Sequence, residues 1–130
     1  MSLDADIVTF AQQPNFATLT TLRPDGFPAT QPMWVDADEE HILINTERHR
    51  RKFQHVQSDP RVTVTIIDHA NPYNYVEVRG TVVDVIGGQQ ARDHIDQLSQ
   101  KYLGQPYGTP IQSERVILKI SPVTHSGKSS

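Results

Sequence analysis

The sequence of 130 residues contains no cysteine, which excludes disulfide bonds, thiolate metal sites and cysteine nucleophiles. It also contains no apolar run long enough to cross a membrane, and Asp4 and Asp6 interrupt the N-terminus before a signal-like segment can form. We therefore expect a cytoplasmic protein without a membrane partner. The formal net charge of −3 and the pI near 6.0 argue against a general nucleic-acid partner.

Several common enzyme motifs are absent as well. The sequence has no Gly-x-Gly-x-x-Gly, P-loop, Gly-x-Ser-x-Gly or His-Glu-x-x-His, so dinucleotide folds of the usual kind, NTPases, serine hydrolases and zincins have no support. His49 and His55 lack a third nearby ligand, so we expect no metal site and interpret them as stacking or hydrogen-bonding residues. We interpret the acidic run 36–40 as a solvated turn, because consecutive carboxylates diverge around a loop.

What the chain does contain fits a single domain over residues 1–130. This length can bury about two-thirds of the surface of the extended chain, and no internal repeat divides it. We expect an N-terminal helix within residues 1–14 and a frayed tail over residues 123–130. The hydrophobic content of 36% is low enough that a partner subunit could complete the core.

Segments rich in β-formers dominate the sequence and predict an antiparallel sheet. The turn 23–26 has Pro at its second position and Gly at its fourth, so it should close a hairpin. Pro28 and Pro32 lack an amide donor, which places their strand at an edge, and Gly80 should make a bulge in the longest strand. Strands are predicted at residues 16–22, 27–36, 41–46, 61–68, 75–86 and 115–121.

Helical patterns accompany these strands without alternating with them. They cover residues 3–13, the stretch after residue 45, and residues 89–103, so a doubly wound sheet is not expected. The fold class is therefore mainly β, a six-stranded antiparallel barrel with flanking helices. The loop 104–110 is dense in glycine and proline, and we expect it to cover a ligand.

The stretch 45–61 carries the strongest functional signal. Four of the twelve Lys and Arg residues, Arg48, Arg50, Arg51 and Lys52, fall within five positions of an acidic chain. His49, Phe53 and Val56 recur at helical spacing, and Asn45 or Thr46 could cap the first turn. A helix N-terminus with added cations can hold a phosphate or carboxylate, although a solvated basic face explains the same charges.

One geometric condition applies to this anion site. Residues two apart on a helix point in different directions, so Arg50 and Lys52 can meet one anion only if Arg50 lies in an irregular first turn. The chain offers no evident nucleophile or acid–base pair beside the anion site. That combination is typical of proteins in which a cofactor carries the chemistry and the protein supplies grip and orientation.

Three stretches also resemble, in the right order, the pyridoxamine 5′-phosphate oxidase-like split β-barrel superfamily, and within it the branch of F420-dependent oxidoreductases. The resemblance covers residues 15 to about 122. It implies an FMN-binding-like split barrel, a homodimer, and a cofactor in the groove between the subunits. The stretches are residues 17–35 (ATLTTLRPDGFPATQPMWV), 44–62 (INTERHRRKFQHVQSDPRV) and 76–82 (VEVRGTV).

The resemblance also implies roles for individual residues. Arg50 and Lys52 would hold the cofactor phosphate, and the partner subunit would contribute Tyr73 and Tyr75. The tricyclic ring would lie against the strand that contains Gln31, Pro32, Met33 and Trp34. Three further cofactor-binding candidates, at the end of the preceding strand and one turn into the helix, are Asn45, Thr46 and His55. From the residue alone, a single tryptophan such as Trp34 is more often a core or dimer-interface residue than the wall of a ligand site.

The expected activity is an oxidoreductase that uses reduced F420 to transfer a hydride to an unidentified small organic acceptor. Arg48 and Arg51 could hold the acidic oligoglutamate tail of F420, which favours the deazaflavin. FMN remains the alternative cofactor, and a non-catalytic flavin or tetrapyrrole-binding protein is a second alternative. The C-terminal region lacks the Arg- and His-containing substrate motif of true pyridoxamine phosphate oxidases, so we do not expect vitamin B6 oxidation.

Overall fold

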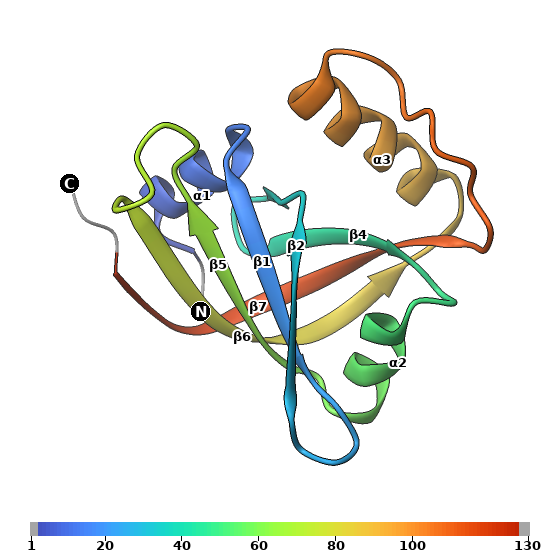
Figure 1. The fold of residues 1–130 in the computed structure, drawn as a ribbon, viewed down its shortest axis with the longest axis horizontal. Coiled ribbons are helices and arrows are strands. Elements are labelled where there is room, and N and C mark those ends of the chain that lie inside the picture. The colour runs from blue at the N-terminus through green and yellow to red at the C-terminus, as the bar shows by residue number, and fades with distance from the viewer. Residues whose placement is uncertain (1–2, 128–130) are drawn as a thin grey trace.

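The computed structural model describes residues 3–127, which form one antiparallel sheet of seven strands with three helices (Figure 1). The helices are α1 (Ala5–Gln12), α2 (Arg51–Ser58) and α3 (Gly88–Leu103). The strands are β1 (Phe16–Leu22), β2 (Pro28–Met33), β3 (Asp36–Ala37), β4 (Ile42–Glu47), β5 (Arg61–Ile67), β6 (Tyr75–Ile86) and β7 (Arg115–Gly127).

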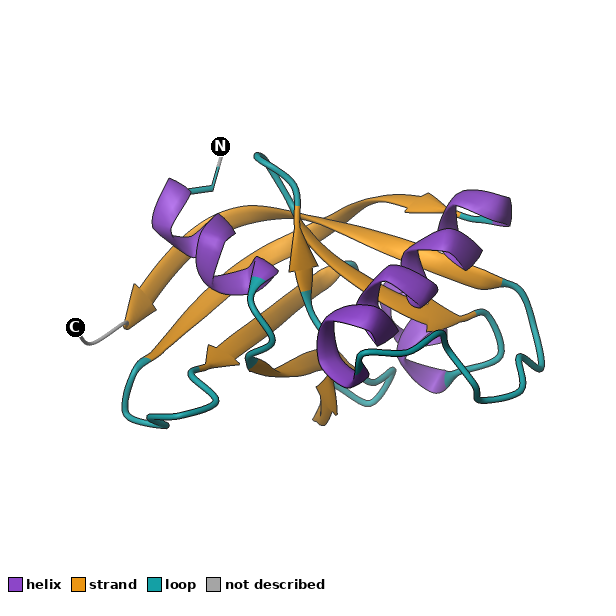
Figure 2. Ribbon diagram, turned by 90° about the horizontal axis from the view of Figure 1, so that it is seen from above, coloured by secondary structure: helices purple, strands orange, loops and turns teal. Residues whose placement is uncertain are grey.

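The strands follow the order β2-β1-β5-β6-β7-β4-β3, so β2 and β3 are the two edges of the sheet. Only Trp34 and Val35 separate the end of β2 from the start of β3. The backbone therefore ties the two edges together, and the sheet curls into a split barrel. Figure 2 shows the strands curling beneath α1 and α3, while α2 lies toward the other end of the barrel in Figure 1.

The strand count differs from the prediction by one, because the segment predicted as a single strand over 27–36 serves both edges. Residues up to Met33 pair with β1, whereas Asp36 and Ala37 pair with β4. Between them, the backbone N–H of Val35 donates to the hydroxyl of Tyr102 on α3 at 3.1 Å instead of to a neighbouring strand. The contact between Val35 and Tyr102 thus splits a segment that its local sequence predicts to be one continuous strand.

The β1–β2 hairpin matches its sequence signal. Gly26 has a φ of +88°, which favours glycine, and its N–H donates to the carbonyl of Arg23 at 2.9 Å. The predicted edge position of the proline-containing strand is also confirmed, since β2 pairs only with β1 among the described strands.

The last strand is longer than predicted. It continues to Gly127 and pairs with β6 along its length, with Thr124 opposite Arg79 and Gly127 opposite Val76. The prediction of a frayed tail was therefore wrong for residues 123–127, because the twelve residues of β6 offer a partner that local composition does not reveal. Residues 128–130 lie outside the described part of the chain.

The predicted bulge at Gly80 is confirmed by a shift of register between Arg79 and Gly80. A Cβ atom on Gly80 would lie 2.5 Å from the carbonyl oxygen of Ser121 and 2.8 Å from Cγ2 of Ile120. Such distances are shorter than a van der Waals contact. Glycine is therefore required here by the close approach of β7.

Helix α2 begins later than predicted. Asn45 and Thr46 are buried in β4, so neither caps the helix, and the N-cap residue is Arg50. Phe53 and Val56 are buried as their spacing predicts. His49 does not extend this apolar stripe: it lies in the turn before the helix, where its Nδ1 is 2.6 Å from the Oγ of Ser113.

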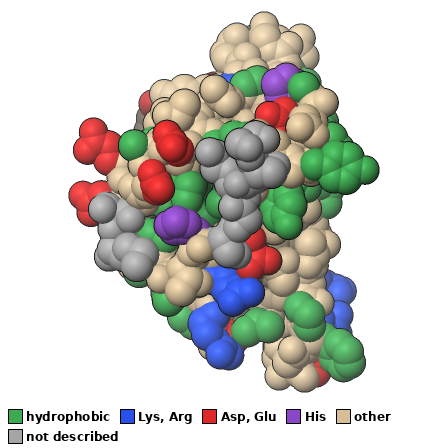
Figure 3. Space-filling model, turned by 90° about the vertical axis from the view of Figure 1, so that its left-hand side faces the viewer, with side chains coloured by type: hydrophobic (Ala, Val, Ile, Leu, Met, Phe, Trp, Pro, Cys, Tyr) green, Lys and Arg blue, Asp and Glu red, His purple; other side chains and the backbone are tan. Residues whose placement is uncertain are grey.

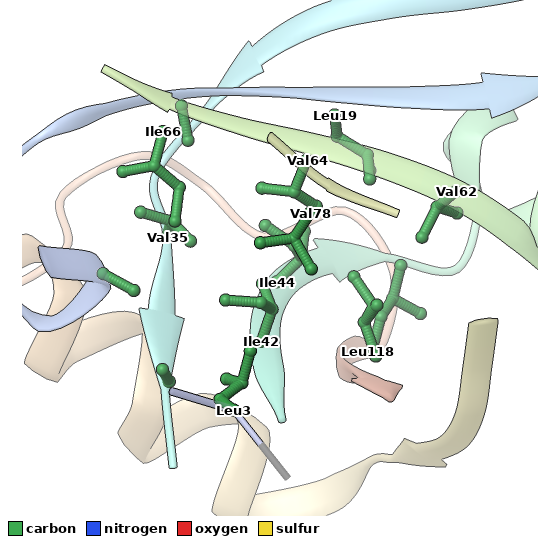
Figure 4. Packing of buried hydrophobic residues seen from close by; sticks show 14 of the residues in the cluster. Leu3, Leu19, Val35, Ile42, Ile44, Val62, Val64, Ile66, Val78 and Leu118 are labelled. Carbon is green, nitrogen blue, oxygen red and sulfur yellow. The ribbon is translucent and has the colours of Figure 1, made fainter. Parts of the chain in front are cut away.

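The core lies inside the curl of the sheet. Strands β1 and β5 alternate between buried and half-buried residues, as expected for strands with one face on the core. Figure 4 shows Ile42 and Ile44 of β4 packing toward Val64 of β5 and Val78 of β6. Helix α1 covers one end of this cluster with the buried side chains of Ile7, Phe10 and Ala11.

On the face in Figure 3, Lys and Arg side chains gather toward the lower part of the view and Asp and Glu mostly toward the upper left. In residues 3–127, no helix is both long and apolar enough to span a bilayer.

Candidate functional site

A basic pocket of about 320 Å³ lies where the edge strand β2 meets the start of α2. Gln31 reaches it from β2. The four other lining residues come from the turn after β4 and from the first turn of α2: His49, Arg50, Arg51 and Lys52. The structure thus brings together three of the predicted cofactor-binding residues, Gln31, Arg50 and Lys52.

The backbone at Arg50 meets the geometric condition for a shared anion site. Arg50 has extended backbone angles, with φ −71° and ψ 145°, and its N–H donates to the carbonyl of Glu47 at 3.1 Å. Its own carbonyl accepts from the N–H groups of Phe53 and Gln54. Because Arg50 lies outside the regular turn, its side chain does not have to follow the helical direction that would separate it from Lys52.

Arg50 and Lys52 bring positive charge to this pocket. Within residues 3–127, no carboxylate lies within ion-pair distance of Arg50 or Lys52. Burial, followed by the nearby charges of Arg50 and Arg115, lowers the pKa of the half-buried Lys52. An anion in the pocket would stabilise the protonated amine, so the site is electrostatically suited to bind one.

Arg48, in contrast, has a carboxylate partner. Its Nε donates to the Oε1 of Glu114 at 2.5 Å, and its guanidinium lies 5.2 Å from the centroid of the Phe53 ring. The other carboxylate oxygen of Glu114 accepts from the N–H of Gly88 at the start of α3. Of the two arginines expected to hold an acidic tail, only Arg51 lines the basic pocket.

A second, larger pocket of about 680 Å³ lies beside the first. The two pockets share β2, since Gln31 lines the basic pocket and Pro32 lines this one. Its walls are mostly apolar and include residues from β1, β2, α3 and the loop after α3. They are Phe16, Ala17, Pro32, Met33, Trp34, Ile95, Leu103, Tyr107 and Gly108, and four polar residues, Asn45, Gln105, Thr109 and Arg115, complete the lining.

Aromatic side chains shape one wall of this apolar pocket. The ring of Trp34 stacks on that of Tyr102, with centroids 5.3 Å apart and planes 5° apart, and meets Tyr107 edge-on at 6.2 Å. The hydroxyl of Tyr102 also donates to the carbonyl of Asn15 at 2.7 Å. Trp34 is therefore both a packed residue and a pocket wall, held by contacts that fix its orientation.

A chain of hydrogen bonds between buried or half-buried side chains runs from Asp36 to Glu47 and includes two residues that line the pocket, Asn45 and Arg115. Nε2 of His94 is 2.9 Å from Oδ2 of Asp36, and Nδ1 of His94 is 3.1 Å from Nδ2 of Asn45. Oδ1 of Asn45 accepts from the Nε of Arg115 at 2.8 Å, and Nη1 of Arg115 lies 3.3 Å from Oε2 of Glu47.

The donors in this chain can be assigned from its two ends. The guanidinium of Arg115 can only donate, so Asn45 turns its oxygen toward Arg115 and its amide N–H groups toward His94 and the carbonyl of Ala91. Nδ1 of His94 must then accept, and its Nε2–H donates to Asp36. The neutral tautomer of His94 therefore satisfies every bond in the chain.

Comparisons with known proteins agree with this geometry. The family model described as pyridoxamine 5′-phosphate oxidase matches residues 3–127. The chain belongs to the pyridoxamine 5′-phosphate oxidase family. This membership confirms the predicted superfamily and, with the antiparallel curled sheet and its flanking helices, the predicted fold class.

Solved structures include several that are similar to this family member. An F420 reductase is 31% identical with a TM-score of 0.79, over 91% of this chain and 94% of the reductase. A conserved hypothetical protein from Mycobacterium tuberculosis is 22% identical with a TM-score of 0.74, over 96% of this chain and 83% of that protein.

A third similar structure is a pyridoxamine 5′-phosphate oxidase-related, FMN-binding protein from Nostoc punctiforme. It is 17% identical with a TM-score of 0.61, over 92% of this chain and 75% of that protein. No curated protein sequence matches the chain. The neighbours thus include an F420 reductase and an FMN-binding protein, which together support a flavin-like cofactor.

The remaining predicted site residues lie elsewhere in this family member. Thr46 lines neither pocket and is buried in β4. His55 lines neither pocket, and its Nδ1 is 2.8 Å from the Oγ1 of Thr21, which anchors α2 to β1. Tyr73 and Tyr75 lie beyond both pockets, with exposed fractions of 82% and 44%. A contribution of these two tyrosines from a partner subunit stays a prediction.

Sequence reasoning missed Arg115, Tyr102 and Tyr107. Arg115 begins an apolar strand, and the only local signal is a charge in front of buried residues. Its partners Glu47 and Asn45 are 68 and 70 positions away in the sequence, so their pairing becomes visible only from the register of β4 against β7, which sets Glu47 opposite Arg115.

Proposed function

We propose that this protein is an oxidoreductase that uses reduced F420 to transfer a hydride to a small organic acceptor. The observation that carries the proposal is the basic pocket, where Arg50 and Lys52 lack a carboxylate partner within residues 3–127 and adjoin an apolar, aromatic pocket through β2. The similarity to an F420 reductase supports the choice of deazaflavin.

The donors in the basic pocket fit a phosphate group. Arg50 can offer a planar pair of N–H donors, Lys52 adds a compact charge, and the carboxamide of Gln31 can donate from the opposite side. The first N–H groups of α2 also lie at this end of the helix. These groups would hold the phosphate and fix the distance of the rest of the cofactor from α2.

The apolar pocket fits a planar ring next to that phosphate. Its volume of about 680 Å³ lies in the range of small-molecule sites. Pro32, Met33 and Trp34 would position the ring and exclude water from one side of it, because the Trp34 orientation is fixed by Tyr102 and Tyr107. When bound, the reduced deazaflavin supplies a hydride, and the acceptor takes up a proton from solvent to complete its reduction.

FMN is a second candidate cofactor. The pairing of Arg48 with Glu114 offsets the charge of one of the two cations expected to hold an oligoglutamate tail, while the phosphate donors would serve FMN equally. The similarity to an FMN-binding protein supports the same alternative. Cofactor binding without turnover would instead indicate a non-catalytic flavin or tetrapyrrole-binding protein.

We further propose a homodimer with the cofactor between the subunits. Phe16, Ile67 and Tyr75 are register partners across β1, β5 and β6, so their side chains lie in one row on the outer face of the sheet. Phe16 is 63% exposed and lines the apolar pocket. A second subunit packed on this row would cover these side chains and bring its own Tyr73 and Tyr75 toward the groove.

The test is a fluorescence titration of the purified protein with F420 and, separately, with FMN. Lys52→Ala should weaken binding of the preferred cofactor about 10- to 100-fold, because it removes a charged contact to the phosphate. Arg92→Ala, at an exposed position of α3, is the matched control and should leave affinity unchanged. Unchanged affinity in Lys52→Ala, or binding of neither cofactor, would contradict the proposal.

A further inference from the structure

The side chain of Arg115 is the one cation that lines the apolar pocket among the described residues. Arg115 is 6% exposed and lines this pocket. Its guanidinium lies 5.3 Å from the centroid of the Tyr107 ring. Its Nε bonds to Asn45 and its Nη1 to Glu47, and a guanidinium carries five N–H donors in all. A side-chain hydrogen bond with Tyr107 engages a further donor, so the capacity left for a ligand is the remainder of the five N–H groups.

The position of this guanidinium is fixed by the chain of side chains behind it. Asn45 holds the Nε–H, and His94 with Asp36 orients Asn45. Because the donors are pre-oriented, binding an oxygen ligand here would cost little side-chain entropy. This arrangement is more elaborate than packing alone requires, since an apolar residue could fill the same space.

The charge on Arg115 is only partly neutralised by Glu47. The Oε1 of Glu47 already accepts from the N–H groups of Gln112 and Ser113 at 2.8 and 2.7 Å. Its Oε2 lies 3.3 Å from Arg115, longer than the 2.7 to about 2.9 Å typical of a charge-assisted bond. Lys52 and Arg50 add further positive charge nearby, so the wall of the pocket favours an anion.

The remainder of the pocket selects the shape of that anion. The apolar and aromatic walls favour a planar, conjugated body, while Arg115 favours a flat group with two oxygens. We propose that Arg115 is a specificity residue that binds the carboxylate of the acceptor, so that the preferred acceptors are planar conjugated carboxylates. This inference rests on the proposed function, which places the cofactor ring along Pro32, Met33 and Trp34, and it assigns the Arg115 side of the same pocket to the acceptor.

Trp34 provides a direct readout of binding. It is the only tryptophan of the chain and lines the same pocket, so its emission reports this site alone. The experiment titrates the protein with trans-cinnamate and with cinnamamide, which has the same conjugated body but no charge. Cinnamate should bind about tenfold more tightly than cinnamamide, as expected for a charged hydrogen-bonded contact.

Two variants assign this preference to Arg115. The double variant Glu47→Gln/Arg115→Gln removes both charges without leaving a lone buried carboxylate, and it should bind the two compounds with equal affinity. Arg92→Ala, a charge change on the exposed face of α3, should keep the full preference. Equal affinities in the wild-type protein, no binding of cinnamate, or a preference that survives in the double variant would each overturn the proposal.

A final experiment tests whether Arg115 binds the acceptor or the cofactor. Equilibrium dialysis of cinnamate is repeated with whichever of F420 and FMN binds, at saturation. Simultaneous binding supports the acceptor site, whereas displacement of cinnamate shows that the cofactor itself occupies the Arg115 side of the pocket and overturns the assignment. Failure of the proposed function appears separately, as absent cofactor binding or an unaffected Lys52→Ala variant, because the cinnamate titration uses no cofactor.

Discussion

Oδ1 of Asn45 accepts the Nε–H of Arg115 at 2.8 Å, and this single contact joins the buried His94–Asp36 pair to the wall of the larger pocket. The sequence suggested that Asn45 caps a helix or binds the cofactor directly. In the structure Asn45 lines the apolar pocket beside Arg115 and also holds the Nε–H of that guanidinium. Asn45 therefore positions Arg115, and its removal should affect both stability and binding.

Asn45→Ala should destabilise the fold by about 2 to 4 kcal/mol. The substitution would leave the Arg115 Nε–H, the His94 Nδ1 and the Ala91 carbonyl without their present partner, and each buried unsatisfied group costs about 1 to 3 kcal/mol, less whatever relaxation recovers. Urea unfolding measures the change. Gln97→Ala, on the exposed side of α3, should shift the midpoint little, and a similar effect from both variants would rule out the network as the cause.

Gly80→Ala should destabilise the protein by about 1 to 3 kcal/mol, the usual cost of overpacking. The added Cβ would lie 2.5 Å from the Ser121 carbonyl oxygen, so β6 or β7 would have to move. Gly108→Ala is the matched control, because nothing lies within 4 Å of its Cβ position and its φ is not in the left-handed region. Thermal unfolding of both variants tests the prediction, and equal melting temperatures would contradict it.

Lys101 should make stability depend on pH in the alkaline range. Burial lowers its pKa from 10.5 to about 8, so between these values the unfolded chain binds more protons than the folded protein. Stability should therefore rise with pH from about 8, relative to a variant without this amine. This rise in stability should end near pH 10. Burial raises the pKa of Tyr102, so above pH 10 the unfolded chain loses the Tyr102 proton more readily than the folded protein does, and stability falls as pH rises.

The measurement compares urea unfolding of the wild-type protein and of Lys101→Met at several pH values between 8 and 10. The variant also loses the bonds that Nζ donates to the carbonyls of Ala11 and Val35, which lowers its stability at every pH. Only the difference in slope reports the titration. Parallel curves for the two proteins would show that the pKa of Lys101 is not lowered in the folded state.

Local patterns predicted most of the strands because their alternation and turn residues are encoded within a few positions. The β1–β2 hairpin, with Gly26 at its turn, and the bulge at Gly80 are examples. The errors arose where a distant contact decided the outcome. Tyr102 takes the N–H of Val35 and splits one predicted strand into two, and β6 extends β7 to Gly127.

The same difference between local and distant signals decides which residues of the candidate site could be predicted from the sequence. Arg50, Lys52 and Gln31 could be found because a run of cations and a family motif mark them, and the structure places all three around one pocket. Arg115 could not be found, because its function depends on Asn45 and Glu47, which reach it only through the β4–β7 register. A residue whose partners are all remote leaves no periodic trace in the sequence.

The link between β2 and β3 has a consequence for how the sheet is protected from aggregation. Trp34 and Val35 hold the two edge strands on the same short piece of backbone, so neither edge can swing outward independently. A circular permutant opened between these two residues would keep every strand pairing but would release both edges. Unpaired edges are templates for intermolecular strand addition, and we expect such a permutant to form larger aggregates through its β2 and β3 edges than the protein with its natural connectivity.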